Sequence, residues 1–207
     1  MMPEWFIKGG PVMWPILTCS IVALAIFLER ILSLRRHKII PRDLSDTVDE
    51  LVSQKKFSEA KTLCKQNKSS FSKIVLTALK HEGKQRNLIK ENVEESGKKE
   101  SLQLGKNIHA LATIAHISPL LGLLGTVLGM LHVFSVITEK GVGNAQSLAG
   151  GISQALITTV AGLIVAIPTV VAYRYLNARV KTFVTEIEEY SLKIVDELTG
   201  APTAGDS

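Results

Sequence analysis

The chain has 207 residues, of which 46% are hydrophobic and 21% are charged, and its formal net charge is +5. Nucleic-acid binding would need a basic face interleaved with aromatic residues, but Phe57 and Phe71 are the only aromatic residues between positions 35 and 106. We therefore expect no nucleic-acid partner. Cys19 and Cys64 lie in segments of different character and no zinc-ligand spacing is present, so neither a disulfide nor a metal site is predicted.

The N-terminal region predicts a short external segment at 1–10, followed by a first transmembrane helix at 11–34. Residues 9–28 carry no charge. A cleaved signal peptide would need a basic start and a small-residue cleavage site, whereas Glu29 and Arg30 follow the apolar run here. Pro11 and Pro15 also interrupt its beginning. We interpret this segment as a retained membrane span.

The next region, 35–106, is polar and its apolar residues recur at helical spacing. Residues 44–67 predict a short helical hairpin, because a polar stretch at 53–56 interrupts the apolar positions. Residues 69–106 are amphipathic, charged and free of proline. They predict a helix, with Gly83 as its candidate break, that runs directly into the second span and projects from the membrane.

Two uncharged stretches, 107–138 and 141–173, follow and are separated by Glu139 and Lys140. At ~1.5 Å per residue each could extend ~45 Å as a helix, which exceeds the ~30 Å hydrocarbon core of a bilayer. We predict a second transmembrane helix at 107–137, a loop at 138–150, a third at 151–176, and a C-terminal helix and frayed tail at 177–207. The expected fold class is all-α: an integral membrane protein with three transmembrane helices and extended cytoplasmic helices.

The distribution of basic residues predicts the orientation, because Lys and Arg collect on the cytoplasmic side of span ends. Lys8 and Lys140 are the only basic residues expected on the opposite side. Residues 35–106 and the C-terminus should therefore lie inside the cell, and the N-terminus outside. The basic residues that carry this assignment follow the first and third spans: Arg30, Arg35, Arg36, Lys38, Arg42, Arg174, Arg179 and Lys181.

Small residues form a stripe on each of the last two predicted spans. The first stripe includes a GxxxG spacing, which allows close backbone approach. These stripes fit either helix packing within one subunit or two walls around a shared space filled by another helix. Pro119 and Pro168 predict kinks in the two spans. The stripe residues are Gly122, Gly125 and Gly129 in the second span, and Gly151, Ala155, Thr158 or Thr159, Gly162 and Ala166 in the third.

Two threonines within these walls, Thr126 and Thr159, are candidate ion-pathway residues. A membrane threonine commonly donates its hydroxyl to the carbonyl four residues earlier, here Gly122 or Ala155. Alternatively, each hydroxyl could hydrate or relay a proton or ion beside a mobile charged group. Neither long stretch contains Asp, Glu, Lys or Arg. If the chain moves protons, a partner must supply the acid.

The histidines of the second span do not fill this role convincingly. His109 and His116 are seven residues apart, too far to chelate one metal ion, and His132 lies further along. His109 is expected at the cytoplasmic edge, whereas His116 could titrate inside the span. Paired carboxylates, a nucleophile with its base, a phosphate loop and a metal set are all missing from the sequence, which disfavours an enzyme.

Two segments resemble the signature segments of the MotA/TolQ/ExbB proton channel family: IAHISPLLGLLGTVLGMLHVF at 114–134 and GGISQALITTVAGLIVAIPTVVAYRYL at 150–176. GGPVMWPI and FLERIL in the first span are also similar to that family. The resemblance covers nearly the whole chain after the first few residues. With three predicted spans rather than four, the chain resembles the ExbB/TolQ branch of this family.

The resemblance implies a homo-oligomer, thought to be a pentamer, in the inner membrane of a bacterium, with no cofactor. Its last two spans would enclose single spans of an ExbD- or TolR-like partner that supplies a protonatable Asp. Proton passage past Thr126 and Thr159 would drive motion that is transmitted to a TonB- or TolA-like protein. Residues of the two stripes, together with Gln154, would then line the pore or contact the partner helix.

One position departs from the family pattern, because Gln154 stands where many ExbB and TolQ proteins have Glu. A glutamine forms hydrogen bonds but carries no charge, so a proton-linked role cannot be transferred to it. Our first hypothesis is a subunit that energises TonB-dependent transport across the outer membrane. The alternatives are a TolQ-like or gliding-motor subunit, and a non-conducting membrane scaffold.

Overall fold

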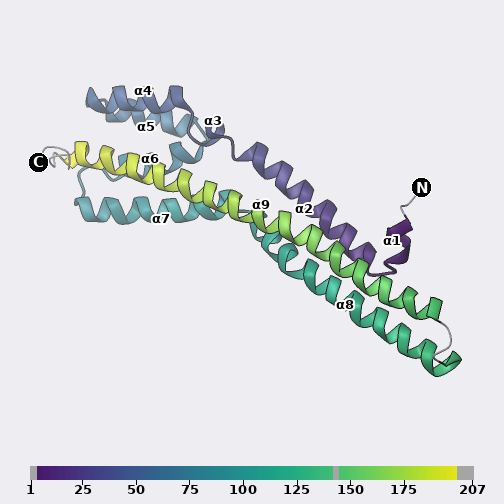
Figure 1. The fold of residues 1–207 in the computed structure, drawn as a ribbon. Helices are drawn as coiled ribbons and strands as arrows, with labels where there is room; N and C mark the ends of the chain where they lie inside the picture. The colour runs from purple at the N-terminus through teal and green to yellow at the C-terminus, as the bar shows by residue number, and fades with distance from the viewer. Residues whose placement is uncertain (1–3, 142–144, 200–207) are drawn as a thin grey trace, which may run out of the picture. The chain divides into compact units, whose positions relative to one another are not determined.

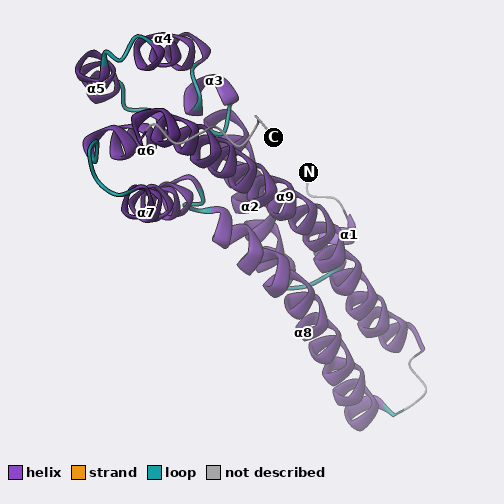
Figure 2. Ribbon diagram, turned by 90° about the vertical axis from the view of Figure 1, so that its left-hand side faces the viewer, coloured by secondary structure: helices purple, strands orange, loops and turns teal. Residues whose placement is uncertain are grey.

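The computed structural model describes residues 4–141 and 145–199, which form helices joined by turns and contain no strand (Figure 2). The predicted tail at 200–207 lies outside the described residues. The chain divides into a membrane unit, Met1–Arg30 with Asn107–Tyr175, and a polar unit, Ile31–Lys106 with Leu176–Ser207. The helices are α1 (Glu4–Lys8), α2 (Met13–Ser33), α3 (Arg36–Ile39), α4 (Arg42–Ser53), α5 (Phe57–Gln66), α6 (Ser70–Lys80), α7 (Arg86–Leu104), α8 (Ile108–Lys140) and α9 (Ala145–Thr199) (Figure 1).

The membrane unit contains α1, most of α2, α8 and the first part of α9. The helices α2, α8 and α9 are each long and apolar enough to cross a membrane. At ~1.5 Å per residue, the 55 residues of α9 extend ~80 Å, so only part of this helix fits in a ~30 Å hydrocarbon core. Arg174 and further charged residues follow Tyr173, so the uncharged part of α9 ends at that position.

Helix extends into both ends of the segment predicted as a loop at 138–150, because α8 continues to Lys140 and α9 begins at Ala145. Gly141 ends α8 with a φ of 72°, a conformation that glycine adopts without a Cβ penalty. Residues 142–144 lie outside the described residues.

The helix predicted from residue 69 breaks at the candidate position Gly83, but its predicted direct run into the second span is wrong. Helix α6 ends at Lys80, near the candidate break at Gly83, which has a φ of 82°. Helix α7 then ends at Leu104, and Asn107 adopts a left-handed φ of 66° before α8 begins. Asparagine tolerates this conformation better than most residues, so the break needs neither proline nor glycine at that position.

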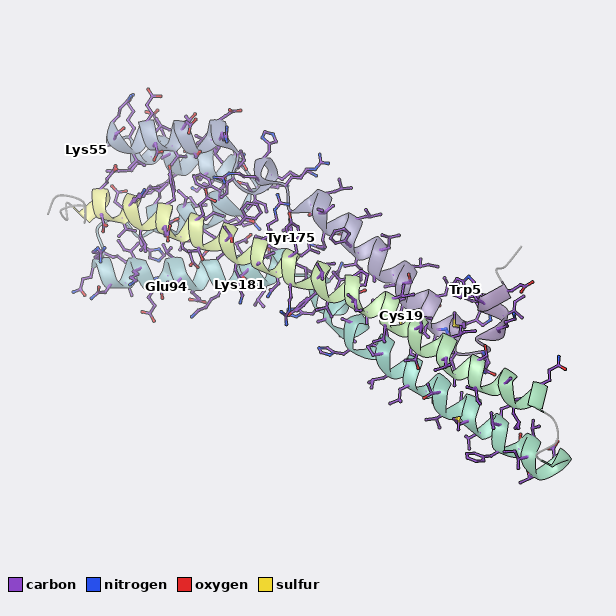
Figure 3. The ribbon with its side chains drawn as sticks, viewed as in Figure 1. Trp5, Cys19, Lys55, Glu94, Tyr175 and Lys181 are labelled. Carbon is purple, nitrogen blue, oxygen red and sulfur yellow. The ribbon has the colours of Figure 1, made fainter. Side chains whose placement is uncertain are left out.

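The polar unit is built from α3–α7 and the last part of α9. Consecutive helices pack in pairs, α4 on α5, α5 on α6 and α6 on α7, and the predicted hairpin is formed by α4 and α5. Charged side chains cover this unit, whereas mainly carbon side chains project from the membrane unit (Figure 3). The buried apolar core includes Val48, Ala60, Cys64, Phe71, Ile74, Val75, Leu79, Ile89, Val93, Ile187 and Val195.

The last part of α9 is fixed to the polar unit by specific polar contacts. The Tyr190 hydroxyl donates to the Ser45 carbonyl (3.1 Å) and to Asp49 Oδ1 (2.7 Å). Its ring packs on Phe71 with centroids 4.9 Å apart. Ion pairs join Arg36 to Glu186 and Arg86 to Asp196. Burial raises the pKa of the Cys64 thiol to about 11, so this cysteine is a core residue with little thiolate at neutral pH.

Candidate functional site

The candidate site is the seam between α8 and the first part of α9, where the two small-residue stripes meet. A methyl group added to Gly122 would lie 3.1 Å from the Thr159 Cα, and one added to Gly129 would lie 3.0 Å from the Ala155 Cβ. A methyl added to Gly162 would lie 3.2 Å from the Gly122 Cα. The two backbones therefore approach too closely for side chains at these positions. The stripes pack against each other within one chain, which is the first of the two sequence interpretations.

Thr158 is fully enclosed in the seam, with an exposed fraction of 0%. It faces Gly125, where an added methyl group would overlap the Thr158 side chain. The Thr158 hydroxyl donates to the carbonyls of Gln154 (3.1 Å) and Ala155 (2.9 Å) within its own helix. Its polar group is thus satisfied locally, as expected for a buried hydroxyl.

Thr159 is half-buried and lies where the two helices meet. Its hydroxyl is 3.3 Å from the Ala155 carbonyl and 3.4 Å from the Gly122 carbonyl on α8. Both distances are long for a hydroxyl donor, whose usual range is ~2.5–3.0 Å. This hydroxyl is therefore shared weakly between two carbonyls, which leaves it more available to another group than the Thr158 hydroxyl.

Thr126 is also half-buried, on the α8 side. Its hydroxyl donates to the Leu123 carbonyl at 2.6 Å, whereas one of the two sequence interpretations gave the Gly122 carbonyl as acceptor. The Gly122 carbonyl is within reach of the Thr159 hydroxyl on α9. This contact between helices cannot be seen in the sequence of α8 alone.

Ser118 belongs to the seam and was missed as a seam residue by the sequence analysis. It is fully buried, and its hydroxyl donates to the Ile114 carbonyl at 2.8 Å. Ser118, Gly122, Gly125 and Gly129 follow the i, i+4, i+7, i+11 spacing of one helix face, and this periodicity could have identified it. Pro119 and Pro168 lie inside α8 and α9, and the kinks expected there stay predictions.

The remaining predicted site residues lie around the seam. Ala166 is buried. Gln154 lies against Gly10 of the N-terminal turn, since a methyl group added to Gly10 would be 3.0 Å from the Gln154 Cδ. His109, His116 and His132 are exposed on this chain. Within residues 4–141 and 145–199, the side chains of His, Cys, Asp and Glu form no group that could hold a metal ion.

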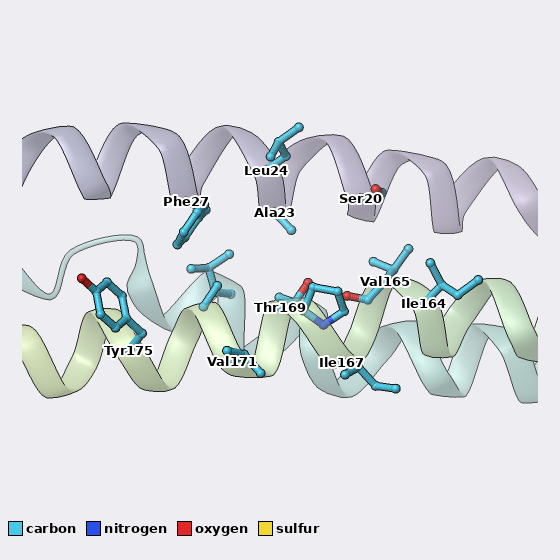
Figure 4. A pocket seen from close by; sticks show the side chains of 13 residues that line it. Ser20, Ala23, Leu24, Phe27, Ile164, Val165, Ile167, Thr169, Val171 and Tyr175 are labelled. Carbon is cyan, nitrogen blue, oxygen red and sulfur yellow. The ribbon is translucent and has the colours of Figure 1, made fainter.

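An apolar groove of about 590 Å³ lies between α2 and α9 of the membrane unit (Figure 4). Thr169 is its most enclosed polar residue, and the Thr169 hydroxyl donates to the Val165 carbonyl at 2.7 Å. The groove carries no acid or base, so its walls suit hydrocarbon rather than an ion. Its lining residues are Ser20, Ala23, Leu24, Phe27, Leu111, Ile164, Val165, Ile167, Pro168, Thr169, Val171, Ala172 and Tyr175.

Comparison with known proteins places this seam in a family. A model described as the MotA/TolQ/ExbB proton channel family matches residues 66–189. A putative biopolymer transport protein ExbB-like 1 of Synechocystis sp. is 33% identical over 180 residues, which cover 83% of this chain and 68% of the relative. The chain belongs to the MotA/TolQ/ExbB proton channel family. The matched region of this family member contains the whole seam, and it begins after α1 and α2.

Relatives from both branches of the MotA/TolQ/ExbB family are similar to this chain. The biopolymer transport protein ExbB of Aquifex aeolicus is 44% identical over 79 residues, which cover 38% of this chain and 53% of the relative. The Tol-Pal system protein TolQ of Haemophilus influenzae is 41% identical over 96 residues, which cover 46% of this chain and 40% of the relative. These two alignments span only about half of the relatives or less.

Proposed function

We propose that this chain is the channel subunit of an ExbB–ExbD-type complex in a bacterial inner membrane, where it uses the proton motive force to energise TonB-dependent transport across the outer membrane. The observation that carries the proposal is the seam. Two half-buried hydroxyls, Thr126 and Thr159, lie in the uncharged parts of α8 and α9, in a chain of a proton channel family. The basic residues after the first and third spans support a cytoplasmic polar unit.

The carrier acid of the proposed mechanism comes from a partner. The two long uncharged stretches hold no carboxylate, so a single-span protein of the ExbD or TolR type would bring an Asp beside the threonines. The Thr159 hydroxyl, held by two long contacts, can turn from the Gly122 carbonyl towards such a group. One proton crossing 100 mV releases ~2.3 kcal/mol, so a few protons suffice to shift a conformational equilibrium by orders of magnitude.

A homo-oligomer, in our proposal a pentamer, would surround the partner helices. Large apolar side chains on the faces of α8 and α9 away from the seam support this, because they are exposed in the single chain and need lipid or protein neighbours. They include Leu120, Leu123, Val127, Leu131 and Phe134 on α8, and Ile152, Leu156, Leu163 and Ile167 on α9.

A TolQ-like role is the second candidate, because the TolQ relative is nearly as similar as the ExbB relative over comparable lengths. The two roles differ in the proteins that receive the work. Co-purification of the chain from its native membrane separates them: an ExbD-like and TonB-like pair supports the first role, and a TolR-like and TolA-like pair supports the second.

Proton flux into proteoliposomes tests the proposal directly. We expect flux only when the chain is reconstituted with its single-span partner, and about a tenfold or larger loss of flux on Thr159→Val, since valine keeps the shape and removes the hydroxyl. Thr158→Val is the matched control, because the Thr158 hydroxyl is buried and bonded within its own helix. Equal flux in the two variants, or none with either partner pair, would replace the channel with the scaffold hypothesis.

A further inference from the structure

The turn between α1 and α2 rests directly on α9. Gly10 has a φ of 72°, and a methyl group added there would overlap the Gln154 Nε2 and lie 3.0 Å from its Cδ. A methyl added to Gly9 would lie 3.3 Å from the Ile157 Cγ2. Two consecutive glycines thus allow the backbone of the turn to contact side chains that lie three residues apart on α9.

Helix α1 is held in the same place by an apolar cluster. Phe6 is buried, and it clusters with Val12, Met13, Ile16 and Ala161. The Phe6 ring meets Trp14 edge to face at a centroid distance of 5.4 Å. Trp5 and Trp14 are both exposed, as is typical of tryptophan at a membrane–water interface, and Figure 3 labels Trp5 on α1.

The face of α9 that carries these contacts is distinct from the face that forms the seam. Gln154, Ile157, Ala161 and Val165 recur at the spacing of one helix face, and this face meets the N-terminal turn, α2 and the apolar cluster. Gly151, Ala155 and Gly162 lie on the neighbouring face and meet α8.

We propose that α1 and its turn form a cap on the outer end of α9, and that Gln154 is the positioning residue that holds this cap. Gln154 acts through the turn and lies outside the ion route that we propose along the seam. An amide suits this position, because it packs on the backbone of Gly10 without bringing a charge into the apolar cluster.

Limited trypsin digestion of the detergent-solubilised chain tests the contact. The rate of cleavage after Lys8, in α1, is measured relative to cleavage after Lys140, since both are followed by glycine. Gly10→Ala should raise this ratio about tenfold, because alanine is strained at the φ of 72° and the added methyl group also displaces the Gln154 side chain. In a Gln154→Ala background the same substitution should raise it less, since only the backbone strain remains.

Gly83→Ala is the matched control for backbone strain. Gly83 has a φ of 82°, and an added methyl group would meet nothing within 4 Å. It should leave the Lys8 ratio unchanged in both backgrounds. If the effects of Gly10→Ala and Gln154→Ala on the Lys8 cleavage ratio simply multiply in the double variant, the two positions act independently. That result would overturn the proposed contact.

Proton flux, which rests on the proposed function, supplies a second readout. If Gln154 acts only through the cap, Gln154→Ala and Gly10→Ala should change flux in proportion to their Lys8 cleavage ratios. A flux loss in Gln154→Ala at an unchanged cleavage ratio would place residue 154 on the ion route and overturn the inference. Thr159→Val should lower flux about tenfold or more without altering Lys8 cleavage. If Thr159→Val leaves flux intact, the channel proposal fails, and the digestion result for the cap still stands.

Discussion

The membrane unit and the polar unit of this chain obtain their packing in opposite ways. In the seam, glycines remove side chains so that α8 and α9 approach backbone to backbone. In the polar unit, large side chains such as Phe71, Ile74 and Leu79 fill the space between helices, and charged residues cover the outside.

The difference follows from the solvent of each unit. Water drives apolar side chains of the polar unit together, at roughly 25 cal/mol per Å² of buried area. Lipid tails are as apolar as leucine and provide no such force, so helices in a bilayer gain more from close contact and from small residues. The polar unit should therefore be sensitive to loss of volume, and the seam to gain of volume.

Removal of a large core side chain should give the largest effect. Phe71 is 1% exposed and packs against Tyr190, so Phe71→Ala should destabilise the polar unit by about 3–5 kcal/mol through lost burial and a cavity. Thermal unfolding of the purified chain, monitored by circular dichroism, measures this. Leu88→Ala is the control: Leu88 is 43% exposed in the same unit, and a similar loss there would contradict the assignment of Phe71 to the core.

Addition of one methyl group to the seam should give the next largest effect. Gly125→Ala should destabilise the membrane unit by about 1–3 kcal/mol, because the new Cβ overlaps the buried Thr158 side chain. Gly150→Ala, on α9, meets nothing within 4 Å and should be neutral or stabilising, since alanine favours helix by up to ~1 kcal/mol over glycine. Equal unfolding midpoints of the two variants would contradict tight packing of α8 on α9.

Much of this contrast could be predicted from the sequence. The apolar runs predicted three spans, the glycine spacing predicted close backbone approach, and residues 44–67 predicted the hairpin formed by α4 and α5. These features could be predicted because an α-helix has a fixed period, so the spacing of residues in the sequence tells which of them share a helix face. The motif segments also led to the family that the comparisons show.

Other features depend on contacts between distant segments and could not be predicted. The Thr159 hydroxyl of α9 lies within reach of the Gly122 carbonyl of α8, a contact that the sequence of neither helix indicates. The position of Gln154 depends on a turn more than 140 residues earlier, and nothing in the periodicity of α9 indicates it. The break before α8 rests on a single left-handed asparagine, Asn107, which an unbroken helical pattern conceals.

One glycine in the polar unit offers a finer test of the comparison, with the smallest expected effect. The Glu188 carboxyl group occupies the space beside Gly97 of α7, so a methyl group added to Gly97 would collide with this carboxyl group. Here a close approach of helices encloses an acid rather than a threonine. Burial, and then the nearby charge of Glu94, raise the pKa of Glu188, and Lys98 offsets part of this.

The raised pKa of Glu188 fixes the sign of the pH effect. The folded state binds the Glu188 proton more tightly than the unfolded state, so its stabilising contribution is complete below the unfolded pKa of ~4.3 and is lost as the pH rises through the folded pKa. Glu188→Gln should therefore raise the thermal midpoint at pH 7, by no more than ~2 °C, and leave it unchanged near pH 4. Glu189→Gln, at an exposed neighbour, removes the same formal charge and is the control variant. If Glu188→Gln raises the thermal midpoint as much at pH 4 as at pH 7, the charge of Glu188 is not what destabilises its contact with Gly97. The fit of the side chain would then limit this contact, as it does at the glycines of the seam.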